Sequence, residues 1–218
     1  MTALWVGHRA RRAESDNPPI GRFVEVDGVR LHYVERGTGP TVVLLHGNLV
    51  LLQDFIASGL IDRLSRNYRV VAFDCPGFGH SERPRDRMWT ASAQARLLHL
   101  AFAKLDIERP VVLGHSWGVL IALGIALDHP ESLRGLVLAS GYYYPTARLD
   151  VPLAAPPAIP VLGDVMRYTV SPVLTRLMLK PVAKAMFWPA ALPDDFFGTG
   201  FVAQMAARAP GGAWLDSA

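Results

Sequence analysis

The sequence predicts an α/β protein with a mostly parallel sheet and helices on both faces of that sheet. Short, continuous apolar runs alternate with longer segments of helical spacing, as expected of repeated βαβ units. An Asp-Gly turn between two alternating segments indicates a hairpin at the start. At 218 residues, with 50% hydrophobic and 19% charged residues, the chain is long enough for one well-packed α/β domain.

The expected elements follow from these patterns in chain order. Around Asp27-Gly28, apolar and polar side chains alternate, which predicts two hairpin strands over 23–26 and 29–34. Continuous apolar runs are typical of parallel strands that are buried on both faces. They predict four more strands, over 41–45, 70–73, 111–113 and 136–139, and crossover helices that include 55–64, 91–105 and 119–127.

The pattern changes after Gly141, where frequent prolines interrupt the chain. Three apolar segments there predict short helices, and we interpret them as a helical lid after the sixth strand; a satellite core on the sheet is the alternative. The predicted short helices are 161–169, 172–179 and 181–188. The expected divisions are an N-terminal extension over 1–22, a core over 23–141, a lid over 142–205 and a tail over 206–218.

Ser116 stands between the apolar run 111–113 and the helical segment 119–127. A serine between a strand and a helix is held on a strained turn that exposes its hydroxyl. Gly114 and Gly118 lie two residues to either side and allow strand and helix to pass closely. We therefore predict a nucleophile turn with positive φ at Ser116. A serine that only caps the helix would not require both glycines.

Composition and charge argue against several other classes of protein. The net charge of +3 and the pI near 9.2 come from scattered arginines without a basic stripe, so we expect no nucleic-acid partner. Cys75 is the only cysteine, which excludes an intramolecular disulfide. No stretch is apolar enough for a signal peptide or a stable membrane insertion, and we expect a cytoplasmic protein. Neither a metal cluster nor a nucleotide fingerprint is present, so no cofactor is implied.

Four motifs together resemble the α/β-hydrolase superfamily over roughly residues 20–145. They are His46-Gly47-Asn48, the stretch from Asp74 to Ser81, the stretch from Gly114 to Gly118, and Leu136 to Ser140. The resemblance implies that Ser116 is the nucleophile and that the backbone N–H groups of Asn48 and Trp117 form an oxyanion hole. It also implies structural roles at the site, without acid–base chemistry, for His46, Gly47, Gly114, His115 and Gly118.

The resemblance also implies a catalytic acid and a histidine on loops that follow the lid. All seven histidines lie at or before His129, and no glutamate follows Glu131. Ser140-Gly141, after the sixth expected strand, is not acidic. We therefore expect a chain that is truncated before the strands carrying the acid and the histidine, and that is catalytically incomplete. The strand 136–139 would then be an exposed sheet edge through which the chain could self-associate.

The favoured function is a serine hydrolase that acts on an ester or similar acyl bond of a small hydrophobic substrate. One alternative is a non-catalytic binding protein with the same fold, and others are an acyltransferase and a cofactor-free perhydrolase. Asn48 and Trp117 also resemble the halide-holding pair of haloalkane dehalogenases. Those enzymes and epoxide hydrolases need an aspartate at position 116, which is serine here. The resemblance therefore disfavours both.

Overall fold

The computed structural model describes residues 18–141 except 49, 85 and 86, together with 143, 177, 180–181, 183–185 and 188–191. The described residues from Pro19 to Tyr143 belong to one compact unit, and those from Leu177 to Ala191 belong to a second. The predicted helix 161–169 and the predicted tail lie outside the described residues, and the predicted domain boundaries stay predictions.

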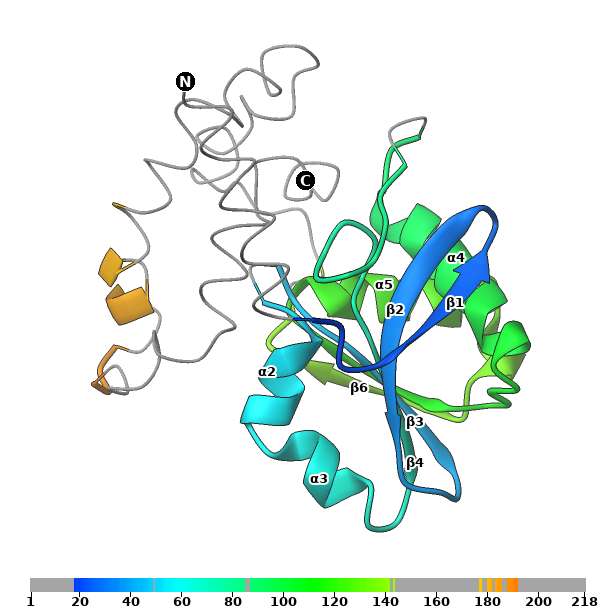
Figure 1. Ribbon diagram of the computed structural model, residues 1–218, viewed down its shortest axis with the longest axis horizontal. Coiled ribbons are helices and arrows are strands. Elements are labelled where there is room, and N and C mark those ends of the chain that lie inside the picture. Colours follow the sequence, from blue (N-terminus) through cyan, green and yellow to red (C-terminus); the bar gives the residue numbers. More distant parts are fainter. Residues whose placement is uncertain are drawn as a thin grey trace. The chain divides into compact units, whose positions relative to one another are not determined.

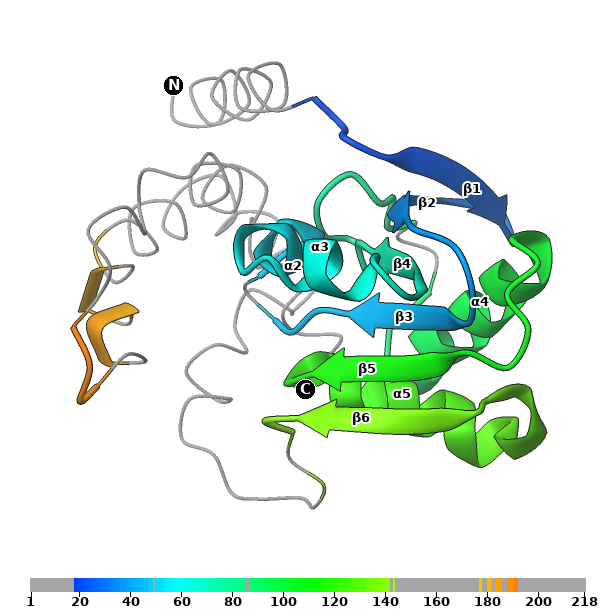
Figure 2. The ribbon, with the colours of Figure 1, turned by 90° about the horizontal axis from the view of Figure 1, so that it is seen from below.

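The first unit is built on a six-stranded sheet with the strand order β1-β2-β4-β3-β5-β6 (Figures 1 and 2). The hairpin strands and the β2–β4 pair are antiparallel, and the other three pairings are parallel. This arrangement confirms the predicted α/β class and the mostly parallel sheet. The strands are β1 (Arg22–Val26), β2 (Val29–Arg36), β3 (Thr41–Leu45), β4 (Arg69–Phe73), β5 (Val111–His115) and β6 (Gly135–Ala139).

The turn between β1 and β2 has the geometry that its sequence predicts. Asp27 and Gly28 have φ values of 49° and 71°, and the flanking residues Val26 and Val29 are paired in register. Positive φ at both central residues matches the right-handed twist of the strands, and Asp-Gly tolerates it at little cost.

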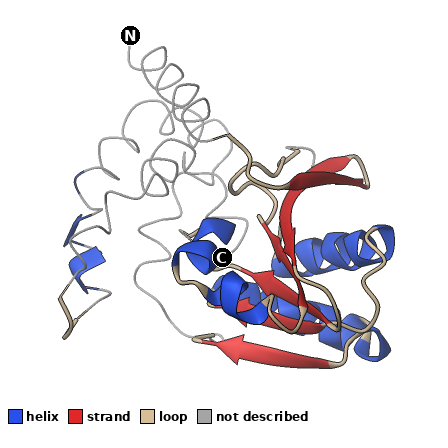
Figure 3. Ribbon diagram, turned by 60° about the horizontal axis from the view of Figure 1, so that its bottom comes forward, coloured by secondary structure: helices blue, strands red, loops and turns tan. Residues whose placement is uncertain are grey.

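Helices cover both faces of this sheet, as expected (Figure 3). They are α2 (Leu52–Ala57), α3 (Leu60–Leu64), α4 (Ala91–Lys104) and α5 (Trp117–Asp128), followed by a 3₁₀ turn over Pro130–Ser132. The predicted single helix over 55–64 is wrong. Gly59 has a left-handed φ of 71°, which ends one helix and starts the next. Helix α4 begins at its predicted position, where the Thr90 hydroxyl accepts a hydrogen bond from the Ala93 N–H.

Alternate side chains of the strands form two apolar layers. Val70 and Ala72 of β4 pack with Phe55 and Ile61 from the α2–α3 side. The next residue, Phe73, points to the other face, where its ring lies 6.4 Å from that of Phe102 in α4. The sheet is therefore buried on both faces near its centre, which explains the continuous apolar runs.

Strand β6 is the last in the sheet order and lies beside β5 (Figure 2). None of its residues is buried, and Val137 is 46% exposed, whereas Val112 in the neighbouring strand is fully buried. Within the part of the chain that is described, β6 is thus the exposed edge that the sequence predicts. Self-association through this edge stays a prediction.

In the second unit, the described residues at 177, 180–181 and 183–185 are helical, and Trp188 and Pro189 form a turn. The predicted helix over 181–188 therefore ends before Trp188, and the role of this region as a lid stays a prediction. Among the helices that the structure describes, none is long and apolar enough to cross a membrane. The cytoplasmic location stays a prediction as well.

Candidate active site

The register of the three central parallel strands brings three loops to one edge of the sheet. Leu45, the last residue of β3, pairs with Phe73, the last residue of β4, and also with Gly114 near the end of β5. The residues that follow these strands therefore emerge side by side. They include His46, Asp74 and Ser116, so the structure brings together the three predicted motifs of the rim.

Ser116 lies on the predicted sharp turn between β5 and α5. Its φ of 51° and ψ of −114° are strained for a residue with a side chain. The Ser116 N–H donates to the Ala139 carbonyl oxygen at 2.9 Å, and the Ser116 carbonyl oxygen accepts from the Val119 N–H at 3.0 Å. The side chain of Ser116 makes no capping hydrogen bond to α5. The turn thus has the predicted geometry, and the helix-capping alternative is wrong.

Three glycines at this turn are required by close backbone contacts. A Cβ on Gly114 would lie 2.4 Å from the Gly118 carbonyl oxygen, and a Cβ on Gly118 would lie 2.3 Å from the Leu45 carbonyl oxygen. A Cβ on Gly47 would lie 2.8 Å from the Cβ of Ser116. The loop after β3 therefore packs directly against the predicted nucleophile. These contacts explain why a side chain does not fit at any of the three positions, and the role of the glycines in the site stays a prediction.

The two predicted oxyanion-hole residues flank this turn. Trp117 is the first residue of α5, where backbone N–H groups have no acceptor within the helix. Asn48 follows Gly47 in the loop that packs on Ser116. The Trp117 side chain is buried, and its Nε1 has no hydrogen-bond partner in the described part of the chain. The role of the Asn48 and Trp117 N–H groups as an oxyanion hole stays a prediction.

Both ring nitrogens of His46 make hydrogen bonds to the backbone. Its Nδ1 lies 2.8 Å from the Gly47 carbonyl oxygen, and its Nε2 accepts from the Cys75 N–H at 3.0 Å. A carbonyl only accepts, so Nδ1 carries the proton and the ring is neutral. Burial lowers the pKa of His46, although the nearby Asp74 carboxylate opposes that shift. His46 cannot act as a base here, since neither ring nitrogen is available.

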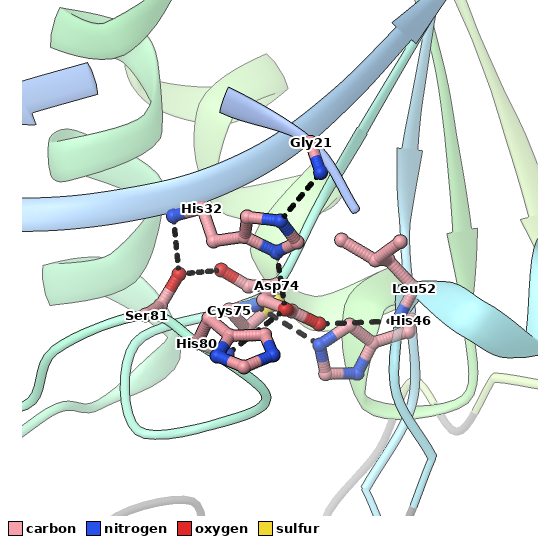
Figure 4. Close-up of polar contacts among 8 residues, drawn as sticks. All are labelled: Gly21, His32, His46, Leu52, Asp74, Cys75, His80 and Ser81. Atoms are coloured by element: carbon pink, nitrogen blue, oxygen red, sulfur yellow. Dashed lines mark hydrogen bonds and ion pairs between the residues drawn. The ribbon is translucent and has the colours of Figure 1, made fainter. Parts of the chain in front are cut away.

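Asp74 is the centre of a second buried network (Figure 4). Its Oδ2 accepts from His32 Nδ1 at 2.8 Å and from the His80 N–H at 3.1 Å, and its Oδ1 accepts from the Leu52 N–H at 3.2 Å. Burial alone would raise the pKa of Asp74, but these donors, led by His32, hold the pKa below its usual value. The carboxylate therefore joins β2, the loop after β4 and the start of α2.

Residues 40–189 match the family described as alpha/beta hydrolase fold. The chain belongs to this family.

Curated relatives of the α/β-hydrolase fold include several hydrolases. Haloalkane dehalogenase 2 of Mycobacterium tuberculosis is 34% identical over 132 residues, which are 61% of this chain and 46% of that protein. The 2-hydroxymuconate semialdehyde hydrolase of Pseudomonas putida is 34% identical over 153 residues, which are 67% of this chain and 53% of that protein. The chain spans about half the length of the curated relatives it matches.

Solved structures share the same fold. The meta-cleavage product hydrolase of Pseudomonas fluorescens superposes with a TM-score of 0.64 at 24% identity, covering 86% of this chain and 65% of that one. An epoxide hydrolase of Vigna radiata gives a TM-score of 0.61 at 20% identity, covering 87% and 71%. These similarities show the fold.

Within this α/β-hydrolase fold, sequence reasoning missed the role of His32. His32 is fully buried; its Nε2 accepts from the Gly21 N–H at 3.1 Å, and its Nδ1 donates to Asp74. Its partners in this network are 11 and 42 residues away in sequence. The only local signal was a histidine between two apolar residues, Leu31 and Tyr33, of a predicted strand.

His115, the last predicted structural residue, ends β5 directly before the nucleophile turn. Its Nδ1 is buried beside Gly47 and has no hydrogen-bond partner among the described residues.

Cys75 is buried. Its burial, and to a smaller extent the nearby Asp74 charge, raises the pKa of its thiol, so the thiol stays protonated. The described ranges contain no cluster of three or more side chains able to hold a metal ion.

Proposed function

We propose that this protein is a serine hydrolase in which Ser116 attacks the carbonyl carbon of a small hydrophobic ester or similar acyl compound. The observation that carries the proposal is the strained backbone of Ser116, with φ of 51° between β5 and α5. Strain of this kind is maintained where it positions a reactive group. The close packing of Gly47 on Ser116 adds a backbone loop beside the hydroxyl.

The reaction needs an oxygen nucleophile and stabilisation of the charge that develops. The Ser116 oxygen would bond to the carbonyl carbon while its proton passes to a base, and the carbonyl oxygen would become negatively charged. The N–H groups of Asn48 and Trp117 would donate to that oxyanion. The leaving alcohol would depart with a proton, and water would then release the acid from the acyl-enzyme.

This scheme requires a base that accepts the Ser116 proton. Among the described histidines near the rim, His32 and His46 have both ring nitrogens in hydrogen bonds. A serine without a base remains a neutral alcohol, and loss of the triad histidine reduces the rate by about a millionfold in one well-studied hydrolase. We therefore propose that the chain alone turns over activated esters only slightly faster than the uncatalysed reaction.

Serine at position 116 favours acyl chemistry over other reactions named among the relatives. A dehalogenase or an epoxide hydrolase of the kind considered above would use a carboxylate at this position. Serine cannot supply that carboxylate. Two relatives are named as semialdehyde hydrolases, and a semialdehyde carries a carbonyl group. A carbonyl compound, such as an ester or another acyl compound, is therefore the favoured substrate class.

A fluorophosphonate probe tests the nucleophile, because it forms a stable phosphorus–oxygen bond with an activated serine. We expect slow labelling of the full chain, located at Ser116 by peptide mapping and abolished by Ser116→Ala. The matched control is Ser58→Ala, which removes an exposed hydroxyl from the same unit and should leave labelling unchanged. Labelling that persists in Ser116→Ala would refute the proposal. Fast ester turnover that depends on Ser116 would refute the proposal that the chain alone is catalytically incomplete.

A non-catalytic binding protein is the second candidate, and the hydrogen bonds on both ring nitrogens of His32 and of His46 favour it. If the probe fails to label Ser116 while a hydrophobic ester still binds in a calorimetric titration, the binding function replaces the hydrolase. The substitution Trp117→Phe would then test whether the buried indole N–H contributes, because that group has no partner among the described residues.

A further inference from the structure

The side chains of His115 and Ser116 meet the loop after β3 at the same place. A Cβ on Gly47 would lie 2.8 Å from the Ser116 Cβ and 3.3 Å from the His115 Nδ1. The Ser116 Cβ and the His115 Nδ1 therefore both lie within 3.3 Å of one point beside Gly47. His115 is the last residue of β5, and the strained turn at Ser116 follows it directly. The ring nitrogen and the proposed nucleophile are thus neighbours in space as well as in sequence.

The His115 Nδ1 is a buried nitrogen without a hydrogen-bond partner in the described part of the chain. His32 and His46 differ in this respect, because all their ring nitrogens take part in hydrogen bonds. A proton on the His115 Nδ1 would form a buried N–H group without an acceptor, and such groups are rare in native proteins. His115 as a whole is only half-buried, so a proton on Nε2 can instead be solvated. This tautomer leaves the lone pair of Nδ1 available to a proton.

The other titratable ring against Gly47 belongs to His46. Its Nδ1 donates to the Gly47 carbonyl oxygen and its Nε2 accepts from the Cys75 N–H, so this ring has no position for a second proton. Burial chiefly, and a positive charge on the nearby His115 to a small extent, lower the pKa of His46. Of these two rings, His115 is therefore the one that can take up a proton.

We infer that His115 accepts the Ser116 proton in the slow reaction of this chain. The inference rests on the proposed hydrolase function and deepens it, and it goes beyond the structural role that the family resemblance implies for His115. As the Ser116 oxygen bonds to the carbonyl carbon, its O–H bond breaks and the proton moves to the lone pair of Nδ1. The π electrons of the carbonyl group move to the carbonyl oxygen. When the bond to the leaving alkoxide breaks, the protonated ring gives that proton to the alkoxide.

The resting geometry explains why the reaction is slow. The His115 Nδ1 makes no hydrogen bond, so the Ser116 hydroxyl must rotate toward it before the proton can move. A well-positioned base typically contributes about a hundredfold to ten-thousandfold to a rate. We expect at least about tenfold from His115, at the lower end or below this range, because no hydrogen bond aligns it with Ser116 beforehand.

The test measures the rate at which a fluorophosphonate labels Ser116 in the full chain, from about pH 5 to about pH 8, where histidines titrate. In this reaction the Ser116 oxygen bonds to phosphorus, fluoride leaves, and the proton passes to His115. The wild-type rate should rise as the imidazole loses its proton and then level off. His115→Gln should label at least about tenfold more slowly and without this rise, because an amide cannot take up the proton. The matched control is His129→Gln, the same change at the other end of α5, which should keep the wild-type rate and pH profile.

The outcomes separate this inference from the hydrolase proposal. If His115→Gln labels at the wild-type rate, or more slowly with the wild-type pH profile, His115 has at most a structural role and the inference is overturned, while the hydrolase proposal stands. Nitrogen-15 NMR of the wild-type chain reads the His115 tautomer: a proton on Nε2 supports the inference, and a proton on Nδ1 overturns it. Thermal unfolding checks that the variants fold, and the wild-type pH profile and tautomer decide the question if His115→Gln does not. Absence of wild-type labelling would overturn both proposals.

Discussion

Replacement of Asp74 by asparagine should strongly destabilise the first unit. The Asp74 carboxylate is fully buried and accepts hydrogen bonds from His32, His80 and Leu52 at 2.8, 3.1 and 3.2 Å. Asparagine has the same shape but only one acceptor oxygen. If that oxygen takes the place of Oδ2 and keeps two bonds, the NH2 group faces the Leu52 N–H, and a donor meets a donor.

The size of the effect follows from the bonds that change. A hydrogen bond to a charged group contributes about 1.5–3 kcal/mol, and a buried N–H left without an acceptor costs about 1–3 kcal/mol. The two bonds that the new amide oxygen keeps are no longer bonds to a charged group, while the cost of burying that charge is relieved. From the lost bond to the carboxylate and the unpaired Leu52 N–H together, we expect the free energy of unfolding to fall by about 3–5 kcal/mol.

Urea unfolding at neutral pH measures this change, and Asp62→Asn is the matched control. Asp62 pairs with Arg36 on the surface, with both side chains largely exposed, so its replacement should change the free energy of unfolding by less than about 1 kcal/mol. The wild-type chain should also lose stability as the pH falls through the lowered pKa of Asp74, and the variant should lack this loss. Similar effects of the two substitutions would refute the central role of Asp74.

Three further predictions concern the contacts of Gly118, the titration of His46 and the buried serine Ser81. Gly118→Ala should lower the free energy of unfolding by about 2–4 kcal/mol, because its Cβ would meet the Leu45 carbonyl oxygen at 2.3 Å; normal stability would show that the strand and helix can separate. Burial lowers the pKa of His46, so below about pH 6.5 the unfolded chain binds a proton that the folded chain does not. The free energy of unfolding should therefore fall by up to about 1.4 kcal/mol per pH unit, and His46→Asn should flatten that slope in acid titrations. Peptide mapping after fluorophosphonate treatment should find Ser81 unmodified, because its buried hydroxyl donates to the Asp74 carbonyl oxygen; an adduct there would show that this network opens.

Much of the fold followed from local signals in the sequence. The Asp27-Gly28 turn, the apolar runs and the glycines around Ser116 each have a short-range physical cause, and the structure has the corresponding elements with ends shifted by one or two residues. The break at Gly59 was missed because apolar side chains continue with helical spacing on both sides of it. A glycine is compatible with either a continuous helix or a left-handed break, and only packing decides between them.

The contacts of the site were harder to predict than its position. The strand ends identified the rim, because parallel strands must place their carboxyl ends together. The pairing of His32 with Asp74 spans 42 residues, and no local pattern indicates that these two residues are partners. The same is true of the bond from Cys75 to His46, which spans 29 residues. Such long-range hydrogen bonds depend on the register of the sheet, which the sequence does not specify residue by residue.

Ser81, His32 and Asp74 are the three residue types of a catalytic triad, and they lie together in the first unit, but their bonds point the wrong way for catalysis. The Ser81 hydroxyl accepts from the His32 backbone N–H at 2.9 Å and donates to the Asp74 carbonyl oxygen at 2.6 Å. The imidazole of His32 accepts from Gly21 through the nitrogen that would have to receive a serine proton. A nucleophile needs a base with an available nitrogen, and this cluster offers none. Ser116 differs in its strained turn and in the backbone loop against it, so geometry rather than residue composition distinguishes the candidate nucleophile from the buried network.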